Sequence, residues 1–460
     1  MYYEKFQNGS VKCIEDEIPF EVPKGWEWCR VRDIAAVKGG KRLPKGVGFS
    51  PCRTAHAYIR VTDMKNHSIN TDDLKYISEE VFLQIKNYTI SKDDLYVTIA
   101  GTIGVTGEVP TELDGMNLTE NAVKITNIQI NKTYLCLIIQ SEFVQQQFQD
   151  KTHQVAMPKL ALERILSTLI PVCTITTQSA MVSKFVEMDS LINQIREEKE
   201  ILAETVSLTK SKILDLAIRG QLVPQDPNDE PASVLLERIR AEKEELIKAG
   251  KIKRDKKESI IFRGEDNSYY QQTGTLIENI NDWNLDDIPI NWELCCLGEI
   301  CDYGNCVNVD TKDIDEEAWV LDLEDIEKDS GKVIHKIRKY ERDSSSTKHL
   351  FKKGQVLYSK LRPYLNKVVL ADEEGFCTSE ILPLNFSNVV EPQYALYYLM
   401  SPTFLKYANR CSYGVKMPRL GTADGRKAVF PLPPFEEQRR ISQHISKIFI
   451  EIDNISNMLL

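Results

Sequence analysis

The sequence lacks any apolar run long enough to span a membrane, and its first eleven residues contain no signal-peptide core. It also lacks CxxC pairs, and its eleven cysteines are an odd number. A secreted, disulfide-stapled domain would show paired cysteines. These absences favour a cytoplasmic protein with reduced, buried thiols and no association with a membrane.

The catalytic motifs of common enzyme classes are missing as well. There is no GxxxxGK[ST] phosphate loop and no strand-linked GxGxxG, the six histidines form no HExxH, and no nucleophile elbow occurs. The segment 431–435 approaches the [DN]PP[FY] tetrad of amino-methyltransferases, but Leu432 stands where an Asn or Asp must bind the target amino group. The sequence therefore predicts a reader or scaffold with no cofactor of its own.

Four cysteines near the start of the second half raise the question of a zinc site: Cys295, Cys296, Cys301 and Cys306. No histidine lies near them, and only Cys295 has a counterpart in the first half, Cys29. Zinc sites combine such ligands at regular spacings. The sequence therefore predicts no metal site.

The charge balance argues superficially against nucleic acid, because 68 acidic residues outnumber 58 basic ones and the net charge is −10. Nucleic-acid binding depends on the local charge of one face and not on the total. An acidic chain can therefore carry a basic cleft, and the composition excludes neither reading.

What the sequence does contain is a long helical pattern at 178–220. Apolar residues follow three-and-four spacing, which is the seam of a coiled coil. The seam residues are Met181, Phe185, Met188, Ile192, Ile195, Leu202, Val206, Ile213 and Leu216. A helix of this length extends roughly 60 Å. It cannot bury a narrow stripe against itself, so it needs a second helix.

A second helix with the same spacing closes the sequence, and it reveals an internal repeat. Its seam residues are Ile441, Ile445, Ile448, Ile452, Ile455 and Leu459. Met181 matches Ile441 and Ile195 matches Ile455, both at an offset of 260 positions. The same offset relates Met157-Pro158-Lys159-Leu160 to Met417-Pro418-Arg419-Leu420 and Thr119-Glu120 to Ser379-Glu380. Borders match while interiors diverge, which indicates one scaffold carrying two different surfaces.

The repeat predicts an α/β (α+β) fold with two tandem pseudo-repeat domains separated by a long antiparallel two-helix coiled coil. The predicted organisation is a loose leader (1–17), a mixed domain (18–177), a long helix (178–220), a linker with a short helix and a basic run (221–287), a second mixed domain (288–436) and a second long helix (437–460). The basic run near 248–257 is interpreted as solvated linker, with phosphate contact as the alternative.

These segments resemble the specificity subunits of type I restriction–modification systems. Each half opens with Pro-x-x-Trp-Glu (Pro23 to Glu27, Pro289 to Glu293) and closes with Met-Pro-[KR]-Leu, an [IF]-Pro strand and a long helix. Segments 214–226, 229–239, 357–367 and 432–441 are also typical of that family. Trp26 and Trp292 are interpreted as core anchors.

The resemblance implies a non-catalytic subunit with two target-recognition domains, each reading one half of a split double-stranded DNA target. The paired helices would set the spacing between the half-sites. Two modification (M) subunits carrying S-adenosylmethionine would dock on the helices and methylate adenine, and restriction (R) subunits using ATP and Mg²⁺ would join them. Two modules on one rigid spacer suit DNA half-sites about one helical turn apart.

Two features depart from the family pattern. The second helix has about half the length of the first, so the chain is expected either to be truncated or to leave 202–216 covered by less or by another subunit. In addition, the segment from Thr98 to Gly104 stands where the second half has Lys360 and Arg362.

Cationic and polar residues near the repeat borders are the predicted DNA-binding residues. They can bridge guanine O6 and N7 or neutralise phosphate. In the first domain they are Lys38, Lys41, Arg42, Lys45, Arg53, Thr102 and Lys159, and in the second Lys360, Arg362, Tyr364, Lys367, Lys416 and Arg419. Two alternatives stay open: a coiled-coil adaptor with no nucleic-acid role, and an unrecognised single-chain nuclease or methyltransferase.

Overall fold

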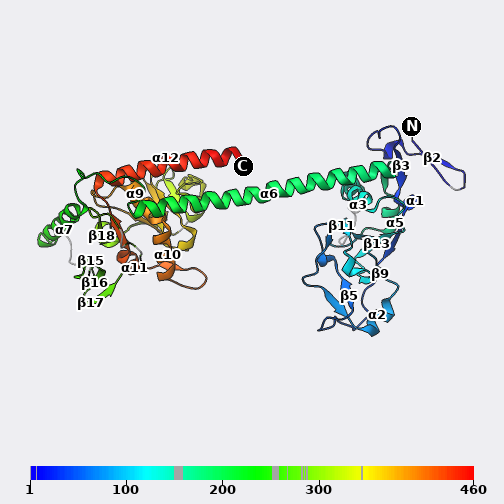
Figure 1. Ribbon diagram of the computed structural model, residues 1–460, viewed down its shortest axis with the longest axis horizontal. Coiled ribbons are helices and arrows are strands. Elements are labelled where there is room, and N and C mark those ends of the chain that lie inside the picture. The colour runs from blue at the N-terminus through cyan, green and yellow to red at the C-terminus, as the bar shows by residue number, and fades with distance from the viewer. Residues whose placement is uncertain are drawn as a thin grey trace. The chain divides into compact units, whose positions relative to one another are not determined.

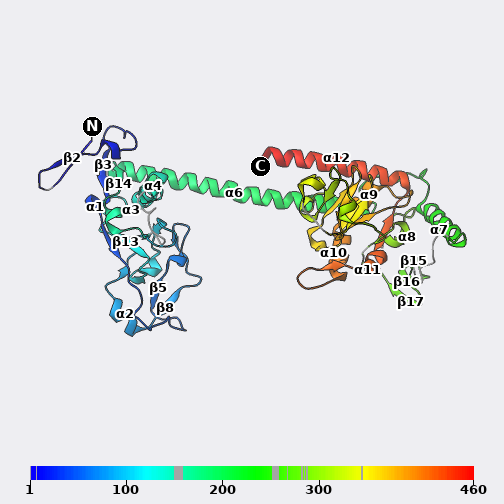
Figure 2. The same cartoon turned by 180° about the vertical axis from the view of Figure 1, so that it is seen from behind.

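A computed structural model describes residues 2–6, 8–149, 159–250, 258–266, 268–280, 283, 285, 288–342 and 346–459. The chain divides into two compact units, Met1–Ile195 and Arg196–Leu460, and Figures 1 and 2 show both from opposite sides. Residues 251–257 of the basic run predicted at 248–257, and the segment from His153 to Pro158, lie outside the described residues.

The first unit begins with a hairpin and not with the loose leader that the sequence predicted. Strands β1 (Tyr3–Lys5) and β2 (Val11–Cys13) pair antiparallel. Arg30, at the end of β3 (Glu27–Arg30), donates to both carboxylate oxygens of Glu4 at 2.8 Å and to Glu17 at 2.9 Å. Charge-assisted bonds of this kind are among the strong ones. They tie the polar leader to the domain, which explains why a segment without apolar pattern is ordered.

Two four-stranded sheets form the body of the first unit. One has the order β11-β10-β13-β4 and the other β8-β5-β12-β9, with β5 and β12 parallel. The strands are β4 (Ala36–Gly39), β5 (His56–Ile59), β8 (Lys75–Ile77), β9 (Thr89–Ile90), β10 (Leu95–Thr98), β11 (Thr106–Glu108), β12 (Met116–Leu118) and β13 (Ala122–Thr126). The expected strands at 58–61, 95–99 and 122–125 are therefore present within two residues, except that Val61 lies in a 3-10 turn.

Helices cover the first of these sheets. They are α1 (Val31–Ile34), α3 (Lys132–Gln140), α4 (Glu142–Gln149) and α5 (Leu162–Leu166), with α2 (Glu79–Ile85) beside the second sheet. The sequence predicted one helix over 134–149. The structure breaks it at Ser141, whose backbone is extended and whose hydroxyl accepts the N–H of Val144 at 3.5 Å. A serine that caps a new helix competes with continuing the old one.

The long helix α6 (Ile175–Ile218) follows β14 (Leu169–Val172), which pairs with β3. Its start is anchored by Gln178, which is fully buried. The Gln178 side-chain oxygen accepts the N–H of Asn131 at 2.8 Å, and its amide donates to the carbonyl of Cys173 at 2.7 Å. The helix predicted for 178–220 is thus present, beginning three residues earlier.

The second unit contains α7 (Ala232–Lys248) and then a three-stranded meander, β15 (Ser259–Arg263), β16 (Tyr269–Thr273) and β17 (Leu276–Asn279). The sequence predicted α7 but took 258–281 for polar linker, and that interpretation is wrong. Ile261 and Gln271 face each other in the pairing and are both buried. The meander has only three buried positions, two in β15, one in β16 and none in β17, which is too little apolar alternation to stand out in the sequence.

The second unit then repeats the architecture of the first. The parallel pair β20 (Trp319–Leu321) and β24 (Gly375–Thr378) corresponds to β5 and β12, and the antiparallel sheet of β22 (Val356–Ser359), β23 (Val368–Leu370) and β25 (Ile381–Leu384) corresponds to β10, β11 and β13. The other elements are β18 (Glu293–Cys296), α8 (Leu297–Ile300), β19 (Val307–Val309), β21 (Lys348–Phe351), η8 (Pro363–Leu365), α9 (Pro392–Met400), α10 (Pro402–Cys411), β26 (Ser412–Tyr413), β27 (Arg419–Leu420), α11 (Thr422–Lys427) and β28 (Val429–Leu432).

Equivalent hydrogen bonds at matching positions of the two halves support the repeat. Tyr134 and Tyr394 are both buried, and each donates its hydroxyl to a proline carbonyl, of Pro171 and Pro431 respectively, at 2.9 Å. Gln438 accepts the N–H of Glu391 at 2.8 Å, as Gln178 does from Asn131. The predicted mixed α/β class with two pseudo-repeats is therefore confirmed.

The last helix, α12 (Phe435–Leu459), lies antiparallel to the C-terminal part of α6 inside the second unit (Figures 1 and 2). Gln225, just after α6, donates to Glu437 at 2.6 Å, and Lys210, earlier in α6, pairs with Asp453. The start of α12 therefore contacts the end of α6, and residues later in α12 contact residues earlier in α6. Ile441 and Ile445 of α12 share one core with Leu214, Ala217 and Ile218.

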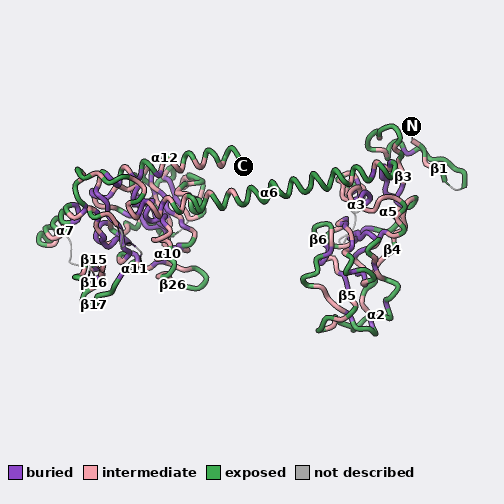
Figure 3. Tube along the Cα trace, viewed as in Figure 1, coloured by how far each residue is buried: buried purple, intermediate pink, exposed green. Residues whose placement is uncertain are grey.

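The antiparallel direction corrects the expectation about which part of the seam lacks cover. Ile213 and Leu216 are half-buried, but Met181, Phe185, Met188, Ile192 and Ile195 are all exposed, as the exposed colouring along α6 in Figure 3 shows. The sequence predicted an antiparallel pair but placed the gap at 202–216, on the ground that the second helix is about half as long as the first. In an antiparallel pair the start of α12 meets the end of α6, so the gap falls at 181–195. Of the remaining seam residues, Leu202, Val206, Ile448 and Ile452 are half-buried, and Ile455 and Leu459 are exposed.

Candidate nucleic-acid interface

Each unit has a turn where the chain passes from one sheet to the other. In the first unit the turn joins β12 to β13 and contains Glu120. In the second it joins β24 to β25 and contains Glu380. The two glutamates stand 260 positions apart, and predicted DNA-binding cations gather around both.

In the first unit, Glu120 collects four donors. Arg42 Nε donates to Oε1 at 2.7 Å, and the hydroxyls of Tyr58 and Thr119 donate to Oε2 at 3.3 and 3.1 Å. Lys159 Nζ donates to the Glu120 backbone carbonyl at 3.2 Å. Burial raises the pKa of Glu120, but the hydrogen bonds, from Arg42 first, outweigh it and leave the pKa below its ordinary value. The carboxylate is therefore ionised at neutral pH and holds Arg42 in place.

In the second unit, Arg419 makes a two-pronged ion pair with Glu380. Its Nε lies 3.1 Å from both carboxylate oxygens and its Nη2 lies 2.8 Å from Oε1. Its Nη1 donates to the carbonyl of Met417 at 3.1 Å. Arg419 occupies the repeat position of Lys159, so the two units use different cations against the same carboxylate.

Arg362 lies against the same loop in the second unit. Its backbone N–H donates to the carbonyl of Pro418 at 2.7 Å, and its φ of +50° is left-handed. A side chain in that region is strained, and such strain concentrates at functional sites. Arg362 Nε is buried and, within the described part of the chain, has no hydrogen-bond partner. A buried guanidinium nitrogen without a partner leaves a donor that a ligand group or a water molecule can use.

The backbone of Lys360 completes this cluster, whereas the other predicted residues of the second unit differ in their availability. The Lys360 N–H donates to the Glu380 carbonyl and its carbonyl accepts from Leu420, both at 3.0 Å. Tyr364 on η8 and Lys416 are exposed. Lys367 is committed to the fold, since its Nζ donates to the carbonyl of Leu323 at 2.6 Å. The structure therefore brings together Lys360, Arg362 and Arg419.

The remaining candidates of the first unit are spread over several elements. Lys38 is exposed on β4, and Lys41 has its Nζ 5.3 Å from the centroid of the Tyr88 ring. Arg53 lies 5.8 Å from the centroid of Tyr76 and lines a separate cavity of about 360 Å³. Lys45 is exposed in a turn, and exposed Thr102 lies in the turn after β10. Only Arg42, Lys159 and the backbone of Lys41, which accepts from Tyr58 at 2.8 Å, belong to the Glu120 cluster.

Sequence reasoning missed the two glutamates as site residues. The matching Thr119-Glu120 and Ser379-Glu380 pairs signalled them, because a charged residue shared by two otherwise different surfaces marks a common element. The predicted site residues were chosen mainly for their positive charge, so neither glutamate was among them. Tyr58, which bonds Glu120, carried no sequence signal of its own.

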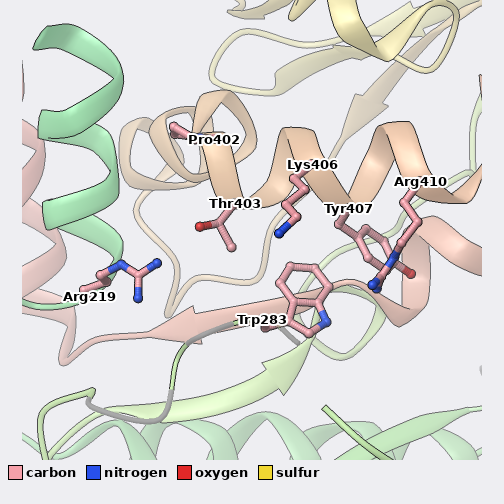
Figure 4. A pocket seen from close by; sticks show the side chains of 7 residues that line it. All are labelled: Arg219, Trp283, Pro402, Thr403, Lys406, Tyr407 and Arg410. Atoms are coloured by element: carbon pink, nitrogen blue, oxygen red, sulfur yellow. The ribbon is translucent and has the colours of Figure 1, made fainter. Parts of the chain in front are cut away.

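A second cationic feature lies at the end of α6 (Figure 4). A cavity of about 170 Å³ is lined by Arg219, Trp283, Pro402, Thr403, Lys406, Tyr407 and Arg410. Arg219 is paired with Asp215 at 3.1 Å, and the Arg410 guanidinium lies 5.9 Å from the centroid of Tyr407. None of these residues was singled out in the sequence, where they are scattered over 192 positions.

The cysteine cluster shows protonated thiols. Burial raises the pKa of Cys296 to about 12 and raises those of Cys295 and Cys301 further. Zinc binds the thiolate form. No group of three potential ligands suited to a metal ion occurs among the described residues. All eleven cysteines are free thiols, and of these Cys13 and Cys52 are exposed and not buried as expected.

Among the helices in the described ranges, no candidate for a membrane span was found. Residues 23–204 and 289–459 match the model of the type I restriction modification DNA specificity domain. The chain belongs to this family. The two matched regions correspond to the two repeats, and each contains one of the glutamate turns.

Individual relatives of this specificity-domain family are more distant. The chain is 30% identical over 260 residues to the type I restriction enzyme EcoAI specificity subunit and 31% identical over 256 residues to the EcoEI specificity subunit, both from Escherichia coli. Each match covers 54% of this chain and 40% of the relative, so the chain spans about two fifths of the length of these relatives.

Among solved structures, a chain from a type I R-M system resembles this chain with a TM-score of 0.56 and 16% identity, covering 96% of this chain and 94% of that one. At this identity the likeness concerns the fold alone.

Proposed function

We propose that this chain is the DNA specificity subunit of a type I restriction–modification complex, and that it reads the two halves of a bipartite double-stranded target. The observation that carries the proposal is the duplication of one cation-bearing turn. Glu120 with Arg42 and Lys159, and Glu380 with Arg419 and the adjoining Arg362, occupy equivalent places on two copies of a specificity domain. Different cations on one scaffold suit different base sequences.

Residues 18–177 and 288–436 would form the two target-recognition domains, with 178–220 and 437–460 as spacer helices and 221–287 as the connection between them. The predicted contacts divide by environment. Arg42 and Arg419 have guanidinium groups bonded to a carboxylate, and Arg362 has a buried Nε without a described partner, which suits contacts with base edges. Lys38, Lys45, Lys416 and Tyr364 are exposed, which suits contacts with phosphate. Lys367 is a fold-stabilising residue in this assignment, because its ammonium group is already bound.

The chain itself would be non-catalytic. Two M subunits carrying S-adenosylmethionine would dock on the helices and methylate adenine, and R subunits with ATP and Mg²⁺ would supply cleavage, all in the cytoplasm. The exposed stripe from Met181 to Ile195 supports helix docking, because a contiguous apolar stripe on a soluble helix marks an interaction surface. An adaptor without a DNA role is disfavoured by the match to a DNA specificity domain.

Sequencing the methylated bases of a host that expresses this chain with its modification partner tests the proposal. A bipartite methyl-adenine motif is expected, and it should vanish when the gene for this chain is deleted. A motif that persists without the chain, or a motif of one undivided block, would contradict the assignment.

A further inference from the structure

Glu120 and Glu380 differ from the cations around them in their exposure. The Arg42 side chain is 79% exposed while Glu120 is 23% exposed. The Arg419 side chain is 32% exposed and Glu380 is 24% exposed. In each pair the carboxylate is therefore less exposed than its cation. Ion pairs this accessible contribute on the order of 0–1 kcal/mol to stability, so stabilising the fold is a weak explanation for repeating the arrangement.

The cation differs between the units, but the carboxylate does not. Glu120 is paired with Arg42, which follows β4, whereas Glu380 is paired with Arg419 on β27. At the position equivalent to Arg419 the first unit has Lys159, which bonds only the backbone of Glu120. The same glutamate position thus binds an arginine from the segment after β4 in the first unit and an arginine from β27 in the second.

The hydrogen-bond geometry at Glu380 leaves a defined pair of donors. Arg419 uses Nε–H and one N–H of Nη2 on Glu380, and one N–H of Nη1 on the Met417 carbonyl. A guanidinium has five N–H donors. Among the described residues, one N–H on Nη1 and one on Nη2 have no acceptor, and arginine N–H groups are the donors that contact O6 and N7 of guanine.

We propose that Glu120 and Glu380 are positioning residues for base recognition, each fixing the direction in which an arginine, Arg42 or Arg419, presents its free N–H groups to a guanine edge in one half-site. This inference rests on the proposed DNA-reading function and deepens it. A carboxylate near DNA repels the phosphates, so it lowers overall affinity. The carboxylate can nevertheless raise selectivity for the correct base, because a guanidinium that is hydrogen-bonded to it cannot turn toward phosphate.

The test is the pair of variants Glu120→Gln and Glu380→Gln, each in the full chain assembled with its methyltransferase partner subunits. The probe is a pool of DNA duplexes with randomised bases, from which bound molecules are selected and sequenced. Wild type is expected to select a bipartite motif. Glu380→Gln should reduce the base preference in one half of that motif about tenfold and leave the other half intact, and Glu120→Gln should do the converse. Both variants should bind unselected duplex more tightly than wild type.

Two controls separate positioning from a general charge effect. Glu324→Gln removes an exposed glutamate that also pairs with an arginine, Arg342, at 3.3 Å, and it should leave both halves of the motif unchanged. In the double variant Glu380→Gln/Arg419→Ala, the loss of preference should equal that of Arg419→Ala alone, because the carboxylate acts through that arginine.

The outcomes distinguish a failure of the positioning role from a failure of the proposed function. An unaltered motif in Glu380→Gln and Glu120→Gln, or an equal loss in both halves from either variant, overturns the positioning role. Tighter binding to every sequence with unchanged preference also overturns it, because the carboxylate would then act only as a repelling charge. If wild type itself selects no motif, the proposed function fails, whatever the variants do.

Discussion

The indole N–H of Trp292 donates a 3.0 Å hydrogen bond to Oε2 of Glu437, and both residues are buried. This bond joins the opening motif of the second repeat to the first turn of α12. Gln225 donates to the other carboxylate oxygen at 2.6 Å. In the first repeat the position equivalent to Glu437 is Thr177, and Trp26 is only half-buried. The second domain therefore has a contact to its helix that the first lacks, in addition to the shared Gln178 and Gln438 contacts.

Replacing Trp292 by Phe should destabilise the second unit by about 1–3 kcal/mol, because it leaves a buried carboxylate oxygen without its donor. Urea unfolding followed by circular dichroism measures the change. Trp26→Phe is the matched control and should cost less. Equal losses in the two variants would show that the Trp292–Glu437 bond is not what anchors α12.

Arg362 is expected to be a DNA contact of the second domain. We expect Arg362→Asn to weaken binding to the cognate half-site by about 1–3 kcal/mol, and asparagine suits the left-handed backbone at this position better than alanine does. Gel-shift titration of the assembled methyltransferase measures the affinity. Arg362→Lys keeps the charge without the fork and should lie between wild type and Arg362→Asn. Unchanged affinity in Arg362→Asn would remove this residue from the interface.

The contact between α6 and α12 should weaken in acid through Asp453. Burial raises the pKa of Asp453, but hydrogen bonds from Lys210 and Lys332 outweigh it and hold the pKa below its ordinary value of 3.8. A lowered carboxylate pKa stabilises the fold above the ordinary value, and this stabilisation is lost as the pH falls through the lowered pKa.

Accordingly, Asp453→Asn should lower the free energy of unfolding by about 1 kcal/mol at pH 7 and by progressively less below the ordinary value. Denaturant titrations across that pH range measure both energies. Glu451→Gln, an exposed position on the same helix, should change neither. A deficit in Asp453→Asn that stays constant down to the lowest pH would show that the charge of Asp453 is not the cause.

The stripe from Met181 to Ile195 should serve association and not the stability of the chain. Phe185→Ser and Ile192→Ser replace exposed apolar side chains, and such changes usually alter stability by less than about 0.5 kcal/mol. Each should weaken co-purification with the methyltransferase subunits, since burying such a side chain contributes about 1.5–3 kcal/mol. The contrasting variant Ile441→Ala removes a fully buried side chain and should cost about 2–5 kcal/mol of stability. Full assembly by both serine variants would locate the docking surface elsewhere.

Much of the architecture was predictable because it depends on local pattern. The three-and-four spacing of apolar residues predicted α6 and α12. The shared offset of 260 positions predicted the two domains, because segments of matching sequence fold alike. The prediction of short elements was wrong where their sequence pattern is weak and tertiary contacts hold them in place. The leader is held by Arg30, and the meander at 259–279 is held by strand pairing and a few buried positions such as Ile261.

The candidate site was predictable only in part. Arg362, Arg419 and Arg42 were found because cations are conspicuous, and the glutamates near them were not, because a carboxylate becomes part of a cationic site only through its neighbours. Arg42 and Glu120 are 78 positions apart and Arg419 and Glu380 are 39 apart. No periodicity links residues at such separations.

The sequence by itself determined that there are two copies of one domain, that a long helix follows each copy, and that positively charged borders recur. These properties follow from local spacing and composition. Only the tertiary structure decided which stretch of the α6 seam is covered and which cation each glutamate holds. Both depend on which residues of segments far apart in the chain lie beside one another, and nothing local encodes that.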